Sequence, residues 1–221
     1  MQRIFDIVFS GLALILLSPL MLSIIAILRC TGEGEIFFLQ SRVGFDGQHF
    51  ELYKFATMLK NSPNIGTGTV TLYQDSRILP FGKWLRRTKI NELPQLINIF
   101  RGDMSIIGPR PQTQRCFNAF PALAQKQIIK VRPGLSGVGS IIFRNEEKMM
   151  HVNNDPDKFY DNIVMPYKGS LEQWYVNNQN IKSYFILIGL TVWVVLSSNT
   201  GLVWGVLKDV PQPPQELEKW M

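Results

Sequence analysis

The strongest constraint on this chain is an apolar run near its start, because residues 7–28 contain no charged side chain. As one straight helix the run would be about 30 Å long, which is the thickness of the hydrocarbon part of a bilayer. Ser18 and Pro19 lie near its middle, and a proline there removes a backbone hydrogen bond and bends the helix. The sequence therefore predicts a bent membrane helix.

Two topologies of this helix stay open. Arg3 precedes the run and Arg29 follows it. A spanning helix places one arginine on each side of the bilayer, whereas a re-entrant helix that turns back returns both to the cytoplasmic face. A cleaved signal peptide is disfavoured, because the run is long for one, has a central proline and ends without a small-residue cleavage site.

The composition narrows the class of partner. A net charge of +6 indicates an anionic partner, which could be a lipid surface, a nucleic acid or a phosphorylated substrate. The apolar run and the lack of a basic stripe with interleaved aromatic residues argue against nucleic acid. Cys30 and Cys116 are the only cysteines and His49 and His151 the only histidines, so no zinc-type spacing exists. We expect free thiols in a reducing compartment.

Residues 86–111 bring cations, a carboxylate and a predicted helix start together. Asn91 is a favourable N-cap, Glu92 lies in the first turn, where the helix dipole favours negative charge, and Pro94 is tolerated there. The helix is expected to run to about Phe100 and to end at Gly102 in a left-handed cap. The apolar residues that would form its buried face at helical spacing are Leu93, Leu96, Ile97 and Phe100.

The charges around this predicted helix start suit a phosphate group. Arg86 and Lys89 precede it, and Arg110 follows between two prolines. A helix N-terminus flanked by guanidinium groups binds phosphate, and Glu92 is available to a divalent metal that bridges phosphoryl oxygens. An ordinary amphipathic helix with solvated charges at its ends is the alternative.

A β-hairpin is predicted upstream of this segment. Residues 35–40 and 48–55 have the pattern of two strands joined around Phe45-Asp46-Gly47, with Arg42 and Lys54 near the closed and open ends. Residues 60–71 are polar and contain glycine and proline, which predicts a flexible loop. Residues 78–87 then predict a short helix whose basic end brings Arg86 to the site.

The second half of the chain predicts further helices and turns. Residues 112–131 indicate an amphipathic helix interrupted near Pro121, with Phe117, Phe120 and Leu123 in the core. Residues 132–137 indicate a glycine-rich turn whose backbone N–H groups lie close to an anion. Residues 151–169 suggest a loop-rich connection, and residues 211–221 suggest an extended tail. Residues 184–196 suggest an apolar helix that is too short to span a bilayer, so we expect this helix to lie in the membrane interface or against the membrane helix.

Several short motifs carry a resemblance to a known family. They are Ser18-Pro19, Arg42-Val43-Gly44, Tyr53-Lys54-Phe55, Thr57-Met58, residues 86–92, Gly102-Asp103-Met104-Ser105, Gly108-Pro109-Arg110-Pro111 and Arg132-Pro133-Gly134-Leu135-Ser136-Gly137. In this order and spacing, over roughly residues 2–196, the chain resembles the bacterial sugar transferases. These are small monotopic phosphoglycosyl transferases that start glycan assembly on polyprenol phosphate.

The resemblance implies an α+β fold with an N-terminal re-entrant membrane helix, a small cytosolic α/β domain with a β-hairpin, and amphipathic interfacial helices. We expect the membrane helix at residues 1–29, the catalytic-type domain at 30–180, a membrane-interface helix at 181–208 and a proline-rich tail at 209–221. The implied location is the cytoplasmic face of the bacterial inner membrane, with membrane lipids as neighbours. A homo-oligomer stays open.

The resemblance also implies a reaction. A sugar 1-phosphate would pass from a nucleotide sugar, usually a UDP-sugar, to polyprenol (undecaprenyl) phosphate, with release of UMP, as the first membrane step of exopolysaccharide or lipopolysaccharide synthesis. Asn91 and Glu92 would occupy the catalytic positions, with Mg²⁺ as the implied cofactor held by Glu92. The residues implied to bind the substrate phosphates are Lys54, Arg86, Arg110, Arg132 and Arg144.

Asn91 departs from the family, which has an Asp-Glu pair here whose aspartate accepts the phospho-sugar. A carboxamide cannot do this, so three readings are open: an introduced change, a natural branch that transfers directly or through another carboxylate such as Asp103 or Glu172, or a catalytically silent relative that binds polyprenol phosphate or sugar nucleotide. Other departures favour a divergent branch. Glu172 stands where the family has aspartate, and Val-Gly-Ser at residues 138–140 stands where many relatives have Trp-Ala-Gln.

Overall fold

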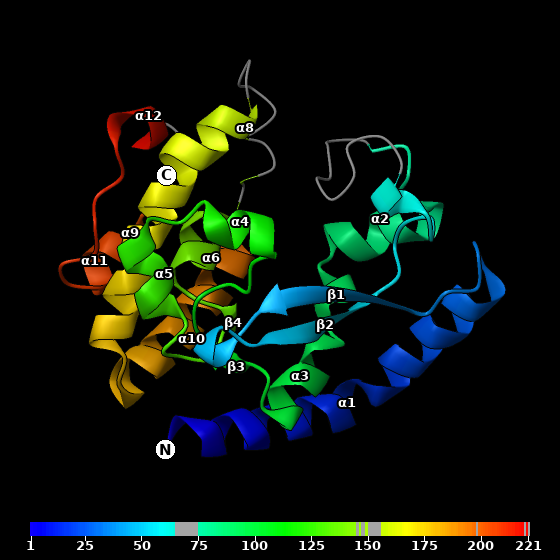
Figure 1. The fold of residues 1–221 in the computed structure, drawn as a ribbon. Helices are drawn as coiled ribbons and strands as arrows, with labels where there is room; N and C mark the ends of the chain where they lie inside the picture. The colour runs from blue at the N-terminus through cyan, green and yellow to red at the C-terminus, as the bar shows by residue number, and fades with distance from the viewer. Residues whose placement is uncertain are drawn as a thin grey trace.

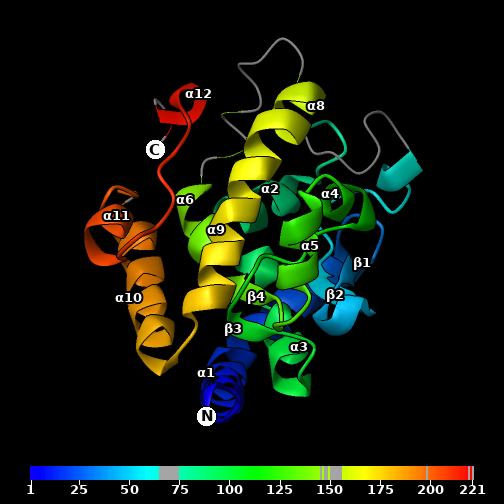
Figure 2. The ribbon, with the colours of Figure 1, turned by 60° about the vertical axis from the view of Figure 1, so that its left-hand side comes forward.

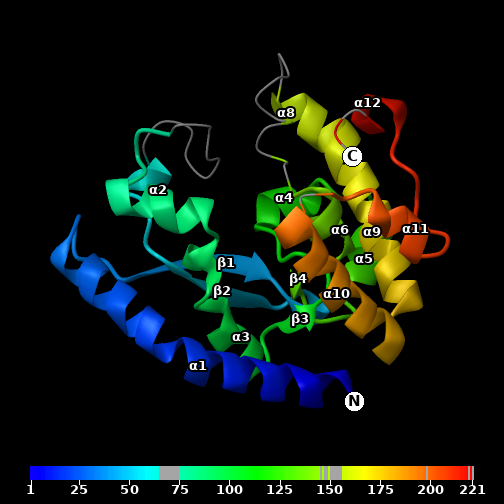
Figure 3. The ribbon, with the colours of Figure 1, turned by 180° about the vertical axis from the view of Figure 1, so that it is seen from behind.

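The N-terminal helix α1 (Gln2–Cys30) runs beneath the rest of the molecule and bends in its second half (Figure 1). The computed structural model describes residues 1–64, 75–144, 146, 149, 156–197, 199–218 and 220. Within these residues α1 is the one helix long and apolar enough to cross a membrane. It stays helical through Pro19, so the predicted bend occurs without a break in the helix (Figure 3).

The two faces of α1 have different surroundings. Its inner face packs on the hairpin and on helix α2 (Pro80–Arg87), where Met21, Ile24 and Leu28 are buried together with Phe55 and Leu85. Its outer face is bare of protein and apolar. The large apolar side chains exposed along the helix include Ile4, Val8, Leu12, Ile15, Leu16, Leu22 and Ile27.

Asp6 fixes the start of α1 to the rest of the fold. Its side chain is 2% exposed, and its Oδ1 accepts hydrogen bonds from the Ser105 hydroxyl (3.0 Å), the Ile106 backbone N–H (3.0 Å) and the Tyr184 hydroxyl (2.9 Å). A buried carboxylate is stable only when it is paired or hydrogen-bonded in this way. One side chain thus joins three segments that are far apart in the sequence.

The predicted hairpin is confirmed. Strands β1 (Phe37–Val43) and β2 (His49–Phe55) pair antiparallel, with Phe37 opposite Phe55 and Val43 opposite His49. The chain turns in the short helix η1 (Phe45–Gly47), where Asp46 has a left-handed backbone (φ 55°). As expected, Arg42 lies near the closed end and Lys54 near the open end.

The segment after the hairpin differs from the prediction at one important point. The 3₁₀ turn η2 (Ser62–Asn64) precedes residues 65–74, which lie outside the described residues together with most of the loop predicted at 60–71. Helix α2 (Pro80–Arg87) matches the prediction. The predicted N-cap at Asn91 is wrong: Asn91 lies inside a 3₁₀ turn, η3 (Ile90–Glu92), and helix α3 (Gln95–Arg101) follows Pro94.

The reason is the backbone at Lys89, which is left-handed (φ 59°) and starts the separate turn that carries Asn91 and Glu92. The end of α3 agrees with the prediction, because Gly102 forms a left-handed cap (φ 104°).

Two parallel strands connect the hairpin region to the helical body. Strand β3 (Ser105–Ile107) pairs with β4 (Gly134–Ser136), and helices α4 (Gln114–Asn118) and α5 (Ala122–Ile128) lie between them in sequence. Phe117 and Phe120 are buried as predicted, but Leu123 is 65% exposed. Helix α5 begins after Pro121 and turns Ala124 and Ile128 inward, which leaves Leu123 on the outer face.

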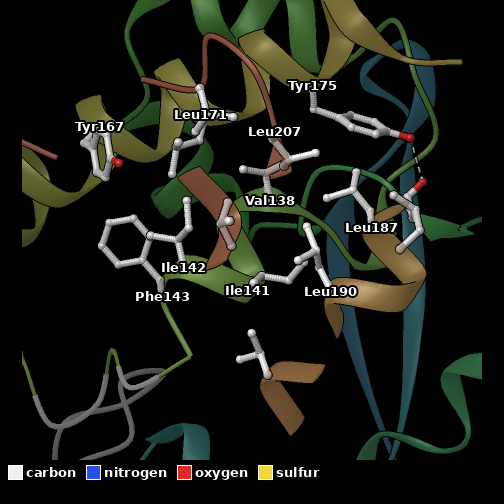
Figure 4. Packing of buried hydrophobic residues seen from close by; sticks show 14 of the residues in the cluster. Val138, Ile141, Ile142, Phe143, Tyr167, Leu171, Tyr175, Leu187, Leu190 and Leu207 are labelled. Carbon is white, nitrogen blue, oxygen red and sulfur yellow. Dashed lines mark hydrogen bonds between the residues drawn. The ribbon is translucent and has the colours of Figure 1, made fainter. Parts of the chain in front are cut away.

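The helical body holds the largest core. It consists of α6 (Val138–Ile142), α8 (Pro156–Phe159), the π-helical turn η4 (Tyr160–Val164), α9 (Met165–Asn178), α10 (Ile181–Ser197), α11 (Leu202–Val206) and α12 (Gln215–Glu218). Figure 2 shows α9 crossing this body, with α10 beside it and α1 below. Leu171 and Tyr175 of α9 meet Val138 and Ile141 of α6 and Leu187 of α10 in a common cluster (Figure 4).

Two predictions for this half are wrong. The described part of the predicted loop at 151–169 is helical from Pro156 onward, and Pro166 is accommodated in the first turn of α9, where its missing N–H costs nothing. The C-terminal tail is not simply extended, because α12 folds back and its Leu217 is fully buried. The apolar helix predicted at 184–196 is α10, and it contacts α1 through Phe185 and Phe5, whose ring centres are 5.1 Å apart.

Asn98 of α3 holds the hairpin in place. Its side chain is fully buried, its Oδ1 accepts the Tyr53 N–H (3.0 Å), and its Nδ2 donates to the Glu51 carbonyl (2.8 Å). These are backbone groups of β2. Asn98 therefore fixes β2, and with it Lys54, against α3.

Replacing Asn98 by alanine is expected to destabilise the fold by about 2–4 kcal/mol, because two partly buried backbone groups of β2 lose their partners. Thermal or chemical unfolding of the detergent-solubilised protein measures this. The control is Asn118→Ala on the exposed surface, where one side-chain hydrogen bond to Gln114 is lost. Equal destabilisation by the two changes would contradict this role.

Candidate active site

Glu92 lies at the centre of a cluster of cations from three parts of the chain. Its Oε1 is 3.2 Å from Nη2 of Arg110, in the loop after β3, and 3.5 Å from Nζ of Lys54, on β2. The side chains of Glu92 and Lys54 are 17% exposed, and that of Arg110 is 38% exposed. The structure thus brings together three of the residues predicted from the sequence, and solvent still reaches them.

The electrostatics of the cluster follow from burial and proximity. Burial alone would raise the pKa of Glu92, but the charges of Arg110, Lys54 and Lys89 outweigh it and lower this pKa to about 2. Glu92 in turn raises the pKa of Arg110. Burial, together with the nearby arginines, lowers the pKa of Lys54 to about 8. Glu92 is therefore a fixed anion at neutral pH.

Arg42 belongs to this site, although the sequence did not separate it from a solvated strand charge. Burial and the charge of Arg110 lower its pKa to about 10, and its Nη1 donates to the Pro111 carbonyl at 3.1 Å. Its buried Nε finds no hydrogen-bond partner within the described ranges. The hairpin register could have identified Arg42 as a neighbour of Lys54. Arg42 is opposite Phe50 and Lys54 is opposite Phe38, so both cations lie on the same face of the hairpin.

Arg86 contributes a further cation at the edge of the cluster. It lies at the end of α2, its Nη1 is 3.5 Å from the Thr57 hydroxyl, and its charge helps to lower the pKa of Lys54. Helix α2 can approach this closely because Gly82 packs on the Thr57 backbone, where an added Cβ would lie 2.2 Å from the carbonyl oxygen. Helix α2 thus carries Arg86 to the edge of the cluster, and a part for it in phosphate binding stays a prediction.

The loop that carries Arg110 is held by backbone contacts with the segment at residues 132–137. Gly108 donates to the Ser136 carbonyl (2.9 Å), and Gly134 donates to the Pro109 carbonyl (2.8 Å). A Cβ on Gly134 would lie 2.1 Å from the Gly108 backbone nitrogen, so only glycine fits. The described contacts of these glycines therefore serve to position the Arg110 loop.

Asn91 lies beside Glu92 in η3. It is 7% exposed, and its buried Oδ1 has no hydrogen-bond partner in the part of the chain that the structure describes. Such a group is costly to bury, and in a site that binds ligands it indicates a partner that comes with the substrate. The carboxamide keeps the shape of an aspartate here but carries no charge.

Glu172 lies behind Arg110, on α9. It is 3% exposed, so it is not a solvated charge on the surface of the helix. The Arg110 backbone N–H interacts with its carboxyl group, and burial raises its pKa to about 8 against the pull of that N–H and of Lys168 and Arg110. Glu172 therefore joins the site from within the protein, predominantly in its neutral form at pH 7.

The remaining predicted residues have contacts elsewhere. Arg132 donates from Nε to the Gly102 carbonyl (2.8 Å) and lies over the Phe45 ring. Arg144 donates to the Val195 carbonyl at 3.4 Å. Asp103 accepts from the Asn98 side chain (3.0 Å) at the far end of α3 from Glu92. These contacts do not bring the three residues to Glu92, and a part for them in substrate binding stays a prediction.

The donor atoms can be compared with the needs of Mg²⁺, which takes oxygen ligands and often uses one or two carboxylates plus substrate phosphates and water. Within the described part of the chain, no group of three or more His, Cys, Asp or Glu side chains could hold a metal. Both cations contact Oε1 of Glu92, which leaves Oε2 for a metal, and Asn91 adds the unpartnered Oδ1. This small set fits a magnesium ion that arrives with the substrate.

Comparisons with known proteins agree with this geometry. The family model described as "Bacterial sugar transferase" matches residues 1–198. The chain is 36% identical to the exopolysaccharide production protein ExoY of Sinorhizobium fredii over 159 residues, which are 66% of this chain and 70% of ExoY. It is 32% identical to the uncharacterized sugar transferase EpsL of Bacillus subtilis over 200 residues, 90% of this chain and 88% of EpsL.

A third relative is longer than this chain. The UDP-glucose:undecaprenyl-phosphate glucose-1-phosphate transferase of Escherichia coli is 36% identical over 143 residues, which are 64% of this chain but 31% of that protein. The similarity therefore covers about a third of that relative.

Proposed function

The chain belongs to the bacterial sugar transferase family, and from this we propose that it transfers a sugar 1-phosphate from a UDP-sugar to undecaprenyl phosphate and releases UMP. The Escherichia coli relative is described as a transferase with UDP-glucose as donor and undecaprenyl phosphate as acceptor. The product, an undecaprenyl diphospho-sugar, is the starting point for a surface glycan. The sugar itself is a matter for experiment.

The observation that carries this proposal is the cluster of Glu92 with Arg110 and Lys54, to which Arg42 and Arg86 add positive charge. Among the described residues, Glu92 is the only carboxylate that forms an ion pair with these cations, so the local charge is positive. A positive, partly buried site attracts a diphosphate and stabilises the charge that develops during phosphoryl transfer.

We propose direct transfer in this chain. An oxygen of the undecaprenyl phosphate attacks the phosphorus attached to the sugar, a new P–O bond forms, and the bond between this phosphorus and the UMP oxygen breaks. Asn91 offers no carboxylate nucleophile, Glu172 is predominantly neutral at pH 7 and lies behind Arg110, and Asp103 lies at the far end of α3. Arg110 and Lys54 would stabilise the negative charge that develops on the departing UMP.

A magnesium ion, when bound, would neutralise phosphate charge and orient the diphosphate. Glu92 would hold it through Oε2, and Asn91 would contribute a neutral oxygen. The pairing of Oε1 with Arg110 and Lys54 keeps Glu92 ionised and in place for this role.

The outer face of α1 supports a membrane location for the site. Its exposed apolar side chains suit lipid, and its inner face packs directly on the elements that carry Lys54 and Arg86. We propose a re-entrant helix that holds the site at the headgroup level of the cytoplasmic face of the inner membrane. Cysteine labelling at Met1 and Thr31 tests it: both positions should be accessible from the same side of the bilayer.

Acceptor dependence tests direct transfer. UMP release by the unchanged chain is expected to require undecaprenyl phosphate, because no enzyme-bound phospho-sugar forms in advance. Asn91→Asp restores a carboxylate and is expected to release about one UMP per chain without acceptor. A panel of UDP-sugars and rapid quenching measure both. An acceptor-independent burst from the unchanged chain would contradict direct transfer.

A second candidate is a catalytically silent, membrane-bound protein that binds polyprenol phosphate or a sugar nucleotide. Asn91 is the observation that favours it, since this substitution discards the family's nucleophile and keeps the cations. This candidate predicts binding of UDP-sugars without UMP release, whether or not acceptor is present. The same panel therefore separates the two functions.

A further inference from the structure

Gly139 and Glu172 face each other, and the Glu172 carboxyl group occupies the space that a side chain at Gly139 would need. A Cβ added to Gly139 would lie 2.4 Å from Oε1 of Glu172 and 3.3 Å from its Cδ, and the first distance is shorter than real Cβ contacts allow. Gly139 lies in the first turn of α6. Its backbone does not have the positive φ that favours glycine, so the reason for a glycine here is the volume that Glu172 occupies.

The carboxyl group that occupies this space is enclosed. Glu172 is 3% exposed, and its Oε2 has no hydrogen-bond partner among the described residues. The groups that face it are the Arg110 backbone N–H and guanidinium from the loop after β3, Lys168 and Tyr175 from its own helix, and Gly139 from α6. Lys168 is already paired with Glu146 at 2.5 Å. The contact to the Arg110 backbone is therefore the one that reaches the active site.

We propose that Gly139 and Glu172 are a matched pair that positions the Arg110 backbone, so that the Arg110 guanidinium reaches Glu92 and the donor diphosphate. The glycine provides the room, and the longer carboxylic side chain uses it to reach the loop. This inference rests on the proposed function for its effect on catalysis, but the pairing itself is a property of the fold. Glu172 is a positioning residue in this account and has no contact with the reacting atoms.

The neutral form of Glu172 suits this task. Burial raises its pKa to about 8, so at pH 7 most chains hold a carboxylic acid at this position. A neutral acid accepts the backbone N–H without drawing the Arg110 guanidinium away from Glu92. This predicts that Glu172→Gln, which has the same length and no charge, keeps most of the activity.

The pairing predicts that two unfavourable changes compensate each other. Gly139→Ala alone places a methyl group too close to the Glu172 carboxyl group. The steric overlap is expected to lower Tm by about 5 °C. Glu172→Asp alone shortens the side chain, so that its carboxyl group no longer reaches the Arg110 loop. This change is expected to lower kcat/KM about 10-fold. In the double variant, Gly139→Ala with Glu172→Asp, the added methyl group fits the space left by the shorter acid, and both quantities should recover.

The experiment measures Tm and kcat/KM for these variants in detergent. If the panel of UDP-sugars reveals no transfer, the affinity for UDP-glucose is measured in place of kcat/KM. Gly205→Ala is the matched control, because a Cβ at Gly205, in α11, meets nothing within 4 Å and should leave Tm unchanged. Recovery in the double variant supports the proposal. Additive losses of Tm would overturn the pairing, whatever the chain catalyses.

The part played by Arg110 is tested separately from packing. If Tm recovers in the double variant but Glu172→Asp never changes kcat/KM or UDP-glucose affinity, the pair fills space without positioning Arg110, and the proposal is overturned. If the unchanged chain releases no UMP, the proposed transfer is refuted. The Tm values of the two single variants and of the double variant would still decide whether residues 139 and 172 are coupled.

Discussion

Glu92→Gln is expected to lower phospho-sugar transfer by about 10³-fold, the largest loss of any single change at this site. The glutamine keeps the shape of the side chain but removes the charge that pairs with Arg110 and Lys54 and the Oε2 proposed for the metal. Because the pKa of Glu92 is lowered to about 2, the carboxylate is fully ionised at neutral pH and the substitution removes a whole charge.

The measurement is the initial rate of UMP release with saturating undecaprenyl phosphate, with Mg²⁺ varied. Glu51→Gln serves as control, because Glu51 is an exposed acid on the same strand as Lys54. A Glu92→Gln chain that retains more than about a tenth of the rate would show that this carboxylate is not needed for the reaction.

Arg110→Lys is expected to lower kcat/KM by about 10²-fold even though the charge is kept. The guanidinium is planar and has several donors, one of which meets Oε1 of Glu92 at 3.2 Å, while others are free for the diphosphate. A lysine ammonium is a point charge that cannot bridge a carboxylate and a phosphate in the same way.

Steady-state kinetics with the preferred UDP-sugar measure this loss. Arg115→Lys is the matched control, since Arg115 is an exposed arginine paired with Asp157 (3.3 Å) outside the site. Loss in Arg110→Lys should appear mainly in kcat, because the arginine is proposed to stabilise charge that develops during transfer. Wild-type kinetics in Arg110→Lys would mean that any cation suffices here.

The sequence was sufficient to predict that Glu92 and Arg110 share a site, because both lie in one short stretch with helix and proline signals. It was not sufficient to predict how they meet. Their approach depends on the left-handed backbone of Lys89, which forms a separate turn before α3, and a non-glycine residue in this conformation has no clear sequence signal. For the same reason Asn91 was predicted to be a helix cap.

The burial of polar groups was also hidden in the sequence. Asn98, Arg42 and Glu172 are polar residues of the kind usually found at the surface, and their partners come from distant segments. The helical stretch from Pro156 could have been found, because Tyr167, Leu171 and Tyr175 recur every four residues and are all buried. Two prolines and a polar composition concealed that pattern.

The buried Asp6 has a consequence for the biosynthesis of the protein. Its hydrogen-bond donors are Ser105, Ile106 and Tyr184, so the last of them leaves the ribosome long after α1 has emerged. Until then the carboxyl group of Asp6 lacks its hydrogen-bond partners, and burying it among apolar side chains is unfavourable. The final docking of α1 on the rest of the fold therefore follows the synthesis of α10, so that the first helix to be made is the last to be locked in place.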